Sequence, residues 1–175
     1  HIDYDERVIH AEGPDGKRFE QRYDRLILAT GSVPVLPRWE GRDLENIQQV
    51  KLFQDAQAVI EKLKDEAIRR VAVVGAGYIG VELAEAFQRC GKEVTLIDQA
   101  PTCVSSNFDA PFSERMAENL SSHGIHLVFG ETGERFEGKD GKVASVVTDK
   151  GTHAADLVCV CVGFRPNAEL FCDAG

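Results

Sequence analysis

The stretch from Val71 to Asp98 constrains the fold of this chain more than any other part of it. It opens with Val-Ala-Val-Val, a β-branched run that predicts a strand buried on both faces of a sheet. Glycines follow at Gly75, Gly77 and Gly80, which is the spacing G-x-G-x-x-G. Apolar residues at helical spacing come next, and a second buried strand ends in Asp98. This order of strand, glycine turn, helix, strand and acid predicts a βαβ unit that binds a dinucleotide.

The three glycines and the acid each have a separate expected role. Gly75 permits the tight turn out of the strand, Gly77 lets a pyrophosphate approach the backbone, and Gly80 lets the helix pack closely on the strand. The helix N-terminus offers free N–H groups and a partial positive charge to the pyrophosphate. Asp98 lies twenty-three positions after Gly75, and the acid that binds the adenosine ribose is expected after about 20. A structural βαβ unit with an ordinary solvated aspartate is the alternative.

The choice of cofactor follows from Asp98. Its carboxylate can accept hydrogen bonds from the ribose hydroxyls, but it would repel the extra 2′-phosphate of NADP(H). Neither Gln99 nor Ala100 supplies a compensating cation. The sequence therefore favours NAD(H) over NADP(H).

The overall composition narrows the class of partner. The net charge of −9 argues against a nucleic-acid partner, which would require a basic face. No apolar run approaches the roughly 20 residues that span a bilayer, and no signal peptide precedes the first strand, so we expect no membrane partner. Five cysteines, an odd number without disulfide-scaffold spacing, predict a cytoplasmic location. None of them forms a convincing redox centre, and His123 and His126 lack the further ligands of a metal site, so we expect no metal.

The residues before the glycine turn predict strands and a linker. Residues 7–12 and 17–23 predict a β-hairpin, and Leu26–Ala29 predicts a buried strand that ends at Thr30-Gly31. Pro34–Arg42 is predicted to be a linker between domains.

The other predicted elements complete an α/β pattern. They are a helical apolar stripe over Gln48–Ile68, a helix from Asp109 to about His123 with Phe112, Met116 and Leu120 on one face, a strand over Ile125–Phe129, a small antiparallel meander over Glu134–Thr148 with a turn at Lys150-Gly151, and a final buried strand over Asp156–Gly163. An internal echo links the segments Asp24–Pro34 and Asp156–Pro166, which share the spacing of Asp, Gly and Pro. Both are expected to deliver a glycine to the carboxyl edge of a sheet, where ligands bind. Chance similarity of two buried strands is the alternative.

Three separated motifs carry a resemblance to a known family. They are Ala-Thr-Gly-Ser-Val-Pro at 29–34, Gly-Ala-Gly-Tyr-Ile-Gly-Val-Glu at 75–82 and Val-Gly-Phe-Arg-Pro-Asn at 162–167. Together they resemble the flavoprotein pyridine nucleotide–disulfide oxidoreductases. Within that family, Thr102-Cys, His123-Gly-Ile and Phe129-Gly-Glu resemble the NADH oxidase branch, whose relatives include NADH peroxidase and coenzyme A-disulfide reductase.

The resemblance implies a fold and a domain organisation. The fold class is α/β, a Rossmann-like three-layer domain with a central parallel sheet and a small antiparallel β-meander crossover. Residues 1–38 would be the C-terminal part of a split FAD-binding domain, with the β-hairpin and the Ala-Thr-Gly strand. Residues 39–165 would form the NAD(H)-binding domain, and residues 166–175 would begin the return to the FAD domain.

The resemblance also extends the set of site residues. Tyr78 and Glu82 lie one helical turn apart, and from the sequence alone a core tyrosine and a surface glutamate are equally good interpretations. In the resembled family the matching tyrosine covers the flavin until nicotinamide displaces it, and the matching glutamate contacts the nicotinamide amide. The glycine that matches Gly163 lines the same pocket. The predicted NAD(H)-binding residues are therefore Gly75, Gly77, Tyr78, Ile79, Gly80, Glu82, Asp98 and Gly163, and Thr30 and Gly31 are predicted at the edge of the FAD site.

The chain departs from an intact family member in several places. It has one G-x-G-x-x-G, whereas the family carries an earlier one for FAD, and the family's redox cysteine, late flavin motif and C-terminal dimerisation domain are missing. We therefore expect a piece of an FAD-dependent NADH oxidase that holds NADH for hydride transfer to FAD and that, when isolated, binds NADH without oxidising it. The alternatives are a domain of an NADH peroxidase or coenzyme A-disulfide reductase, a reductase feeding a ferredoxin, and a pure binding module.

Overall fold

The computed structural model describes residues 1–172, and these form two compact units. The first unit contains His1–Val33 together with the residues from Phe164 onward, and the second unit contains Pro34–Gly163. The predicted boundaries, after residues 38 and 165, lie a few residues later in the chain. The assignment of the first unit to an FAD-binding domain stays a prediction.

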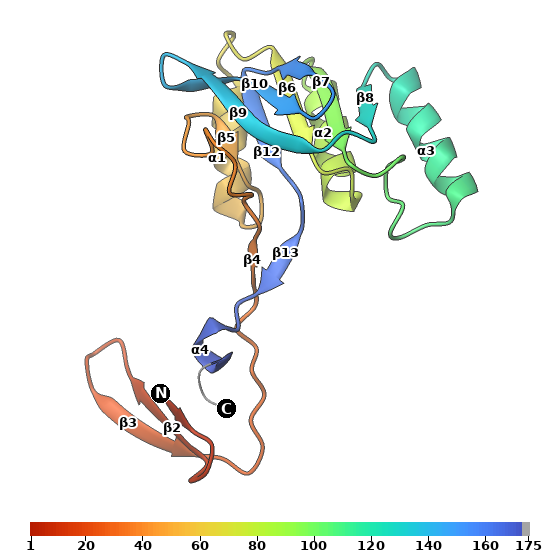
Figure 1. Ribbon diagram of the computed structural model, residues 1–175. Coiled ribbons are helices and arrows are strands. Elements are labelled where there is room, and N and C mark those ends of the chain that lie inside the picture. Colours follow the sequence, from red (N-terminus) through yellow and green to blue (C-terminus); the bar gives the residue numbers. More distant parts are fainter. Residues whose placement is uncertain (173–175) are drawn as a thin grey trace. The chain divides into compact units, whose positions relative to one another are not determined.

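A five-stranded sheet forms the centre of the second unit (Figure 1). All of its pairings are parallel, as predicted for strands joined by helical crossovers. The strands, in spatial order, are β5 (Ile47–Gln48), β12 (Leu157–Val160), β6 (Arg70–Val74), β7 (Glu93–Asp98) and β8 (His126–Phe129).

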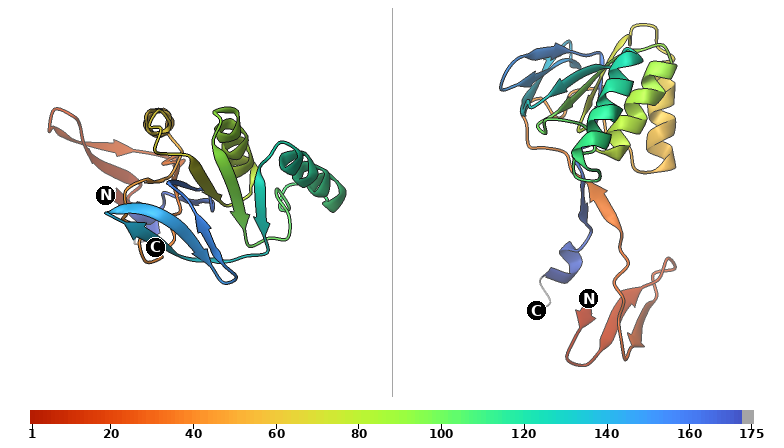
Figure 2. Two further views of the ribbon diagram at one scale, coloured as in Figure 1. Left: turned by 90° about the horizontal axis from the view of Figure 1, so that it is seen from above. Right: turned by 90° about the vertical axis from the view of Figure 1, so that its right-hand side faces the viewer.

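The sheet lies between two other layers (Figure 2). Three helices cover one face: α1 (Phe53–Leu63), α2 (Tyr78–Arg89) and α3 (Ala110–Ser122). An antiparallel meander covers the other: β9 (Gly133–Lys139), β10 (Lys142–Thr148) and β11 (Thr152–Ala154). The predicted three-layer α/β fold with a meander crossover is therefore confirmed.

Alternating side chains of β6 serve both layers. Val71 and Val73 belong to the apolar cluster shared with the helices, whereas Ala72 and Val74 belong to the cluster shared with the meander. Successive residues of a strand point to opposite faces, so a strand buried on both faces must be apolar at every position. The run Val-Ala-Val-Val meets this requirement.

Two helices differ from the prediction. The helical stripe over Gln48–Ile68 is shortened to α1, because the backbone N–H groups of Lys51 and Leu52 both bond to the Asp55 carboxylate and fix the helix start there. Helix α3 has the predicted bounds within one residue, but its predicted apolar face is wrong. Leu120 is buried, together with Ser113, and Ala117 packs beside them at helical spacing. Phe112 and Met116 directly precede Ser113 and Ala117 in the sequence, so they lie about 100° away around the helix and stay exposed.

The predicted linker Pro34–Arg42 is also wrong. Leu36 and Trp39 pack against the meander-side cluster, and the Trp39 ring lies 5.2 Å from that of Phe136 between centroids. A Cβ on Gly133 would collide with the Trp39 ring at 2.0 Å. Apolar side chains seated this closely make the segment part of the second unit, although its prolines prevent regular structure.

The first unit has the predicted hairpin. Strands β2 (Val8–Glu12) and β3 (Arg18–Arg22) pair antiparallel, with β1 (Ile2–Asp3) beside β2. The segment from Phe164 onward contributes two short elements. They are β13 (Phe164–Pro166), which pairs with β4 (Ser32–Pro34), and the helix α4 (Glu169–Cys172).

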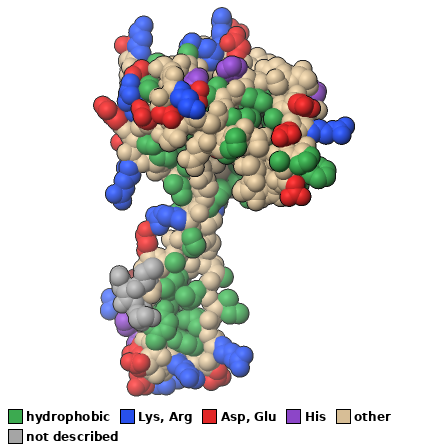
Figure 3. Space-filling view, turned by 45° about the vertical axis from the view of Figure 1, so that its right-hand side comes forward, with side chains coloured by type: hydrophobic (Ala, Val, Ile, Leu, Met, Phe, Trp, Pro, Cys, Tyr) green, Lys and Arg blue, Asp and Glu red, His purple; other side chains and the backbone are tan. Residues whose placement is uncertain are grey.

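The buried strand predicted over Leu26–Ala29 does not form. Ile27 is 87% exposed and Leu28 is 45% exposed, and among the described residues no strand pairs with this segment. A strand needs a neighbour to satisfy its backbone groups, so the apolar run alone is insufficient. Of the two segments that share the Asp, Gly and Pro spacing, only Asp156–Pro166 therefore contains a buried strand of a sheet. Figure 3 shows hydrophobic side chains on the surface of this unit, where Phe19 is also exposed.

Within the described part of the chain, no helix is both long and apolar enough to cross a membrane.

Candidate functional site

The glycine turn lies where three parallel strands end. Gly75 follows β6 with a φ of +105°, a conformation that favours glycine. A Cβ at Gly75 would lie 2.4 Å from the carbonyl oxygen of Cys161, just past the end of β12. On the other side, the Gly75 N–H donates to the carbonyl of Ile97 in β7 at 2.8 Å. The turn is therefore packed between the carboxyl ends of both neighbouring strands.

Gly77 and Gly80 meet opposite surroundings. Gly77 is the N-cap of α2 and has no side chain to cap it, and a Cβ added there would have no atom within 4 Å. A Cβ on Gly80 would lie 1.8 Å from the carbonyl oxygen of Gly75. Gly80 thus allows close packing of helix on turn, whereas Gly77 leaves open space beside the free N–H groups of the first helical turn. A diphosphate fits that position in both shape and charge.

Asp98 ends β7 beside this turn and is half-buried. Its Oδ2 accepts a hydrogen bond from the Ala76 N–H at 2.5 Å, and its Oδ1 accepts one from the Ala100 N–H at 2.7 Å. Each carboxylate oxygen can accept a second hydrogen bond. Asp98 can therefore hold the glycine turn and still bind two vicinal hydroxyl groups.

The loop after β8 joins the same edge. Its Phe129-Gly-Glu run carries part of the family resemblance, but sequence reasoning placed none of these residues in the site. The Gly130 N–H donates to the Ala100 carbonyl at 2.9 Å, and the Glu131 N–H donates to the Asp98 carbonyl at 3.1 Å. The Glu131 carboxylate accepts a hydrogen bond from the Thr148 hydroxyl at 2.6 Å and contacts His153 Nε2 at 2.8 Å. These two contacts lower the pKa of Glu131. The position of Glu131 directly after a buried strand was the signal in the sequence, since parallel strands gather their carboxyl ends.

The residues predicted at the nicotinamide end lie on the surface of the second unit. Tyr78 is 58% exposed and Glu82 is exposed on the next turn of α2, whereas Ile79 is half-buried. Gly163 has a φ of +109°, and a Cβ there would meet no atom within 4 Å. Its carbonyl accepts a hydrogen bond from the Val35 N–H at 2.9 Å. Tyr78, Glu82 and Gly163 are thus open to a ligand.

Thr30 and Gly31 belong to the first unit. The Thr30 hydroxyl donates to the Asn167 carbonyl at 2.6 Å, and the Asn167 N–H donates to the Gly31 carbonyl at 2.9 Å. Gly31 has a φ of +74°.

Three of the cysteines are unsuited to redox chemistry at neutral pH. Burial raises the pKa of Cys161 to about 12 and also raises that of the fully buried Cys159. Burial likewise raises the pKa of Cys103, which lies in the loop before α3. A protonated thiol is a poor nucleophile. Cys90 is exposed at the end of α2, and the side chain of Cys172 lies outside the described residues.

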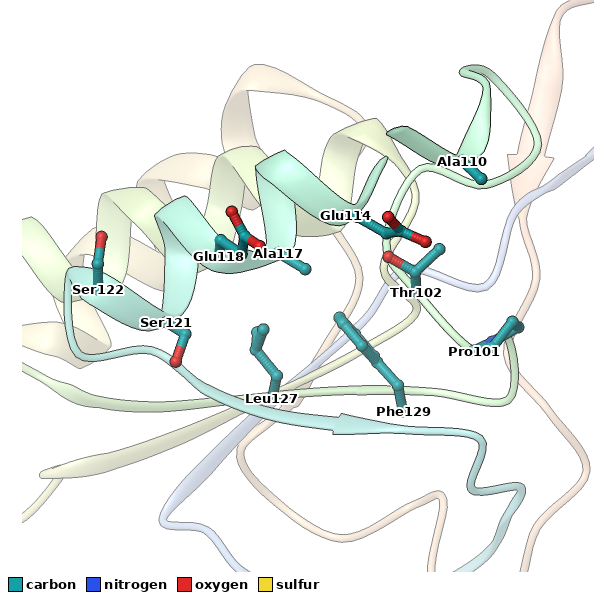
Figure 4. A pocket seen from close by; sticks show the side chains of 10 residues that line it. All are labelled: Pro101, Thr102, Ala110, Glu114, Ala117, Glu118, Ser121, Ser122, Leu127 and Phe129. Atoms are coloured by element: carbon teal, nitrogen blue, oxygen red, sulfur yellow. The ribbon is translucent and has the colours of Figure 1, made fainter. Parts of the chain in front are cut away.

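A groove of about 840 Å³ lies elsewhere, between α3 and the edge strand β8 (Figure 4). Leu127 and Phe129 form its apolar floor, and Glu114 and Glu118 line it from α3. None of the predicted NAD(H) or FAD residues is among its lining residues, so we do not place the cofactor there. Across the described residues, no three His, Cys, Asp or Glu side chains come together as metal ligands would.

Comparison with known proteins agrees with this fold. The model of the pyridine nucleotide-disulphide oxidoreductase family matches residues 1–175. The chain is 50% identical to an NADH oxidase of Streptococcus pyogenes over 180 residues, which are 97% of this chain and 39% of that protein.

Two solved structures extend the comparison. A water-forming NADH oxidase from Lactobacillus brevis, bound to NADH, is 37% identical with a TM-score of 0.85, over 97% of this chain and 37% of that one. An engineered water-forming NADPH oxidase derived from it, bound to NADPH, is 36% identical with a TM-score of 0.84 over the same shares. The chain thus spans about two fifths of the length of these relatives, and it belongs to the pyridine nucleotide-disulphide oxidoreductase family.

Proposed function

We propose that the second unit binds NADH at the glycine turn and positions it for hydride transfer within an NADH oxidase-type flavoprotein. One observation carries the proposal. The open space at Gly77, beside an uncapped helix N-terminus, lies next to a carboxylate that is already fixed by the turn itself. The first feature suits a diphosphate and the second suits the adenosine ribose.

The engineered relative supports the role of Asp98. That protein uses NADPH after substitutions that include a glycine and an aspartate eighteen positions later, both changed to alanine, with arginine introduced directly after the aspartate. Gly80 and Asp98 have the same separation in this chain, and Gln99 follows Asp98. Removing a carboxylate and adding a cation at this place is the change that a 2′-phosphate requires.

The two ends of the cofactor would be held by different residues. Gly75, Gly77, Ile79 and Gly80 form the turn for the pyrophosphate, and Asp98 accepts hydrogen bonds from the ribose. The nicotinamide would be oriented by Tyr78, Glu82 and Gly163, because all three are exposed. Tyr78 and Glu82 lie in the first turns of α2, and Gly163 lies just past the end of β12. Bound NADH supplies a hydride, and FAD is the acceptor that the family uses. The chain's own contribution is binding and orientation.

The whole protein is proposed to be an FAD-dependent NADH oxidase located in the cytoplasm. Its partners would be NADH, the remainder of the FAD-binding domain, for which Thr30 and Gly31 form one edge, and a C-terminal dimerisation domain. The identity of 50% to an NADH oxidase favours this branch over NADH peroxidase and coenzyme A-disulfide reductase.

The test is a combined binding and oxidation assay on the chain of residues 1–175. Purified protein should be colourless, should saturate with one NADH per chain in a fluorescence titration, and should leave NADH absorbance unchanged in air when free FAD is added. Failure of NADH to bind would overturn the proposed function. A yellow preparation with stoichiometric FAD, or rapid oxygen-dependent loss of NADH, would show that the flavin site is larger than Thr30 and Gly31.

A further inference from the structure

We propose that Glu131 is a positioning residue for Asp98, and that its side-chain contacts with Thr148 and His153 hold the loop that supports Asp98. This inference rests on the proposed function, because it concerns the adenosine end of the same site. Glu131 itself is not expected to touch the cofactor.

The first link runs from the loop after β8 to the segment that carries Asp98. Two backbone hydrogen bonds make it: Glu131 N–H to the Asp98 carbonyl at 3.1 Å, and Gly130 N–H to the Ala100 carbonyl at 2.9 Å. The Ala100 N–H in turn donates to the Asp98 carboxylate at 2.7 Å. Displacement of Gly130 and Glu131 would therefore move the carboxylate that is proposed to bind the ribose.

The second link anchors that loop to the meander layer. The Glu131 carboxylate accepts a hydrogen bond from Thr148, whose side chain is buried, and meets His153 Nε2 at 2.8 Å. The side chains of Glu131 and His153 are only 19% and 17% exposed, so water competes weakly for this contact. Lys150 adds a hydrogen bond from its ammonium group to the Gly130 carbonyl at 2.5 Å.

A third pair of bonds closes the loop against the same turn. The Thr132 N–H donates to the Asp149 carboxylate at 2.8 Å, and the Asp149 N–H donates to the Thr132 carbonyl at 2.9 Å. Glu131 thus contacts two layers. Its backbone N–H bonds to Asp98 at the end of the parallel sheet, and its side chain bonds to Thr148 and His153 in the meander.

The experiment compares four variants of the chain with the unmutated protein by NADH and ADP-ribose titration. Glu131→Ala should weaken both ligands about tenfold, since both contain the adenosine ribose. Glu131→Gln keeps an acceptor for the Thr148 hydroxyl and should recover most of the affinity. His153→Gln should weaken both ligands less than Glu131→Ala does, because Thr148 still holds the Glu131 carboxylate. Glu137→Ala is the control, because Glu137 is also a hydrogen-bonded meander carboxylate, held by Arg135 and Ser145.

A readout that needs no cofactor separates this inference from the proposed function. Amide hydrogen exchange at Gly130, Glu131 and Ala100 should accelerate in Glu131→Ala and stay unchanged in Glu137→Ala. If the unmutated chain fails to bind NADH, the proposed function is wrong, while the exchange rates still test the coupling. If NADH binds and the affinities and exchange rates of Glu131→Ala equal those of Glu137→Ala, the positioning role is wrong. An affinity in Glu131→Gln as low as that in Glu131→Ala would overturn the role of the hydrogen bond from Thr148.

Discussion

The backbone N–H of Ala76, inside the glycine turn, donates a hydrogen bond of 2.5 Å to the carboxylate of Asp98 at the end of the next strand. The residue proposed to bind the ribose therefore also fixes the loop proposed to bind the pyrophosphate. Because one side chain serves both positions, a change at Asp98 should affect binding more than the loss of its ribose contacts alone.

We predict that Asp98→Ala weakens NADH binding tenfold or more and narrows the preference for NADH over NADPH. Each hydrogen bond to a charged group contributes about 1.5–3 kcal/mol, and about 1.4 kcal/mol corresponds to a factor of ten in affinity. Calorimetric titration of both cofactors measures the effect. Asp43→Ala is the control, since the Asp43 side chain is 92% exposed on another loop of the same unit. Identical NADH affinities for these two variants would contradict the role of Asp98.

The glycines of the turn should separate binding from folding. Gly77→Val should abolish NADH binding while leaving the urea midpoint almost unchanged, because the backbone φ is −70° and the space around the new side chain is empty. Gly80→Val should instead lower stability by several kcal/mol, since its Cβ would overlap the Gly75 carbonyl oxygen. Circular dichroism and NADH fluorescence give the two readouts. A Gly77→Val protein that binds NADH normally would show that the pyrophosphate lies elsewhere.

The nicotinamide end can be tested apart from the adenosine end. Glu82→Ala should weaken NADH binding several-fold, as expected for the loss of one exposed hydrogen bond of about 0.5–1.5 kcal/mol. It should leave ADP-ribose affinity unchanged, because ADP-ribose has no nicotinamide. Glu85, which is also exposed on α2 but is not among the predicted site residues, provides the control as Glu85→Ala. Equal losses for NADH and ADP-ribose would place Glu82 outside the nicotinamide site.

Stability should depend on pH through Asp156, which joins the starts of β6 and β12. Burial raises the pKa of this carboxyl group, but hydrogen bonds from the Arg70 side chain and from the backbone N–H groups of Arg69 and Arg70 outweigh it, so the pKa is lowered overall. A lowered folded pKa gives stability that is fully present above the unfolded value of about 3.9 and is lost as the pH falls through the folded value.

Asp156→Asn should therefore lower the free energy of unfolding at pH 7 by about 1–3 kcal/mol, the scale of one lost charged hydrogen-bond acceptor. The difference from the unmutated chain should shrink below pH 4. Urea unfolding at both pH values tests this, with Asp43→Asn as an exposed control. A deficit that stays constant with pH would show that the charge of Asp156 contributes nothing.

The sequence predicted the parallel-sheet core well because its signals are local. Strand β6 is apolar from Val71 to Val74, the glycine spacing is fixed by the turn, and Asp98 directly follows the buried Leu96 and Ile97. The same local reasoning missed Glu131, whose importance comes from Thr148 and His153 in another layer. No spacing rule connects those residues, because the meander brings them together only in three dimensions.

The wrong predictions also have tertiary causes. Leu26–Ala29 has the composition of a buried strand, but Ile27 is exposed because no strand in the described residues lies beside it. Trp39 was assigned to a linker on account of nearby prolines, yet its ring packs on Phe136. In α3 the choice between Phe112 and Ser113 as the buried position depends on the rotation of the helix against the sheet, and Ser113 is fully buried.

The most direct test of the account is a calorimetric titration of the unmutated chain with NADH and with NADPH under the same salt conditions. The position of Asp98 beside an open glycine turn predicts one NADH site per chain and at least tenfold weaker binding of NADPH. Equal affinity for the two cofactors, or no saturable binding of NADH, would contradict the claim that this edge of the sheet is a site selective for NADH.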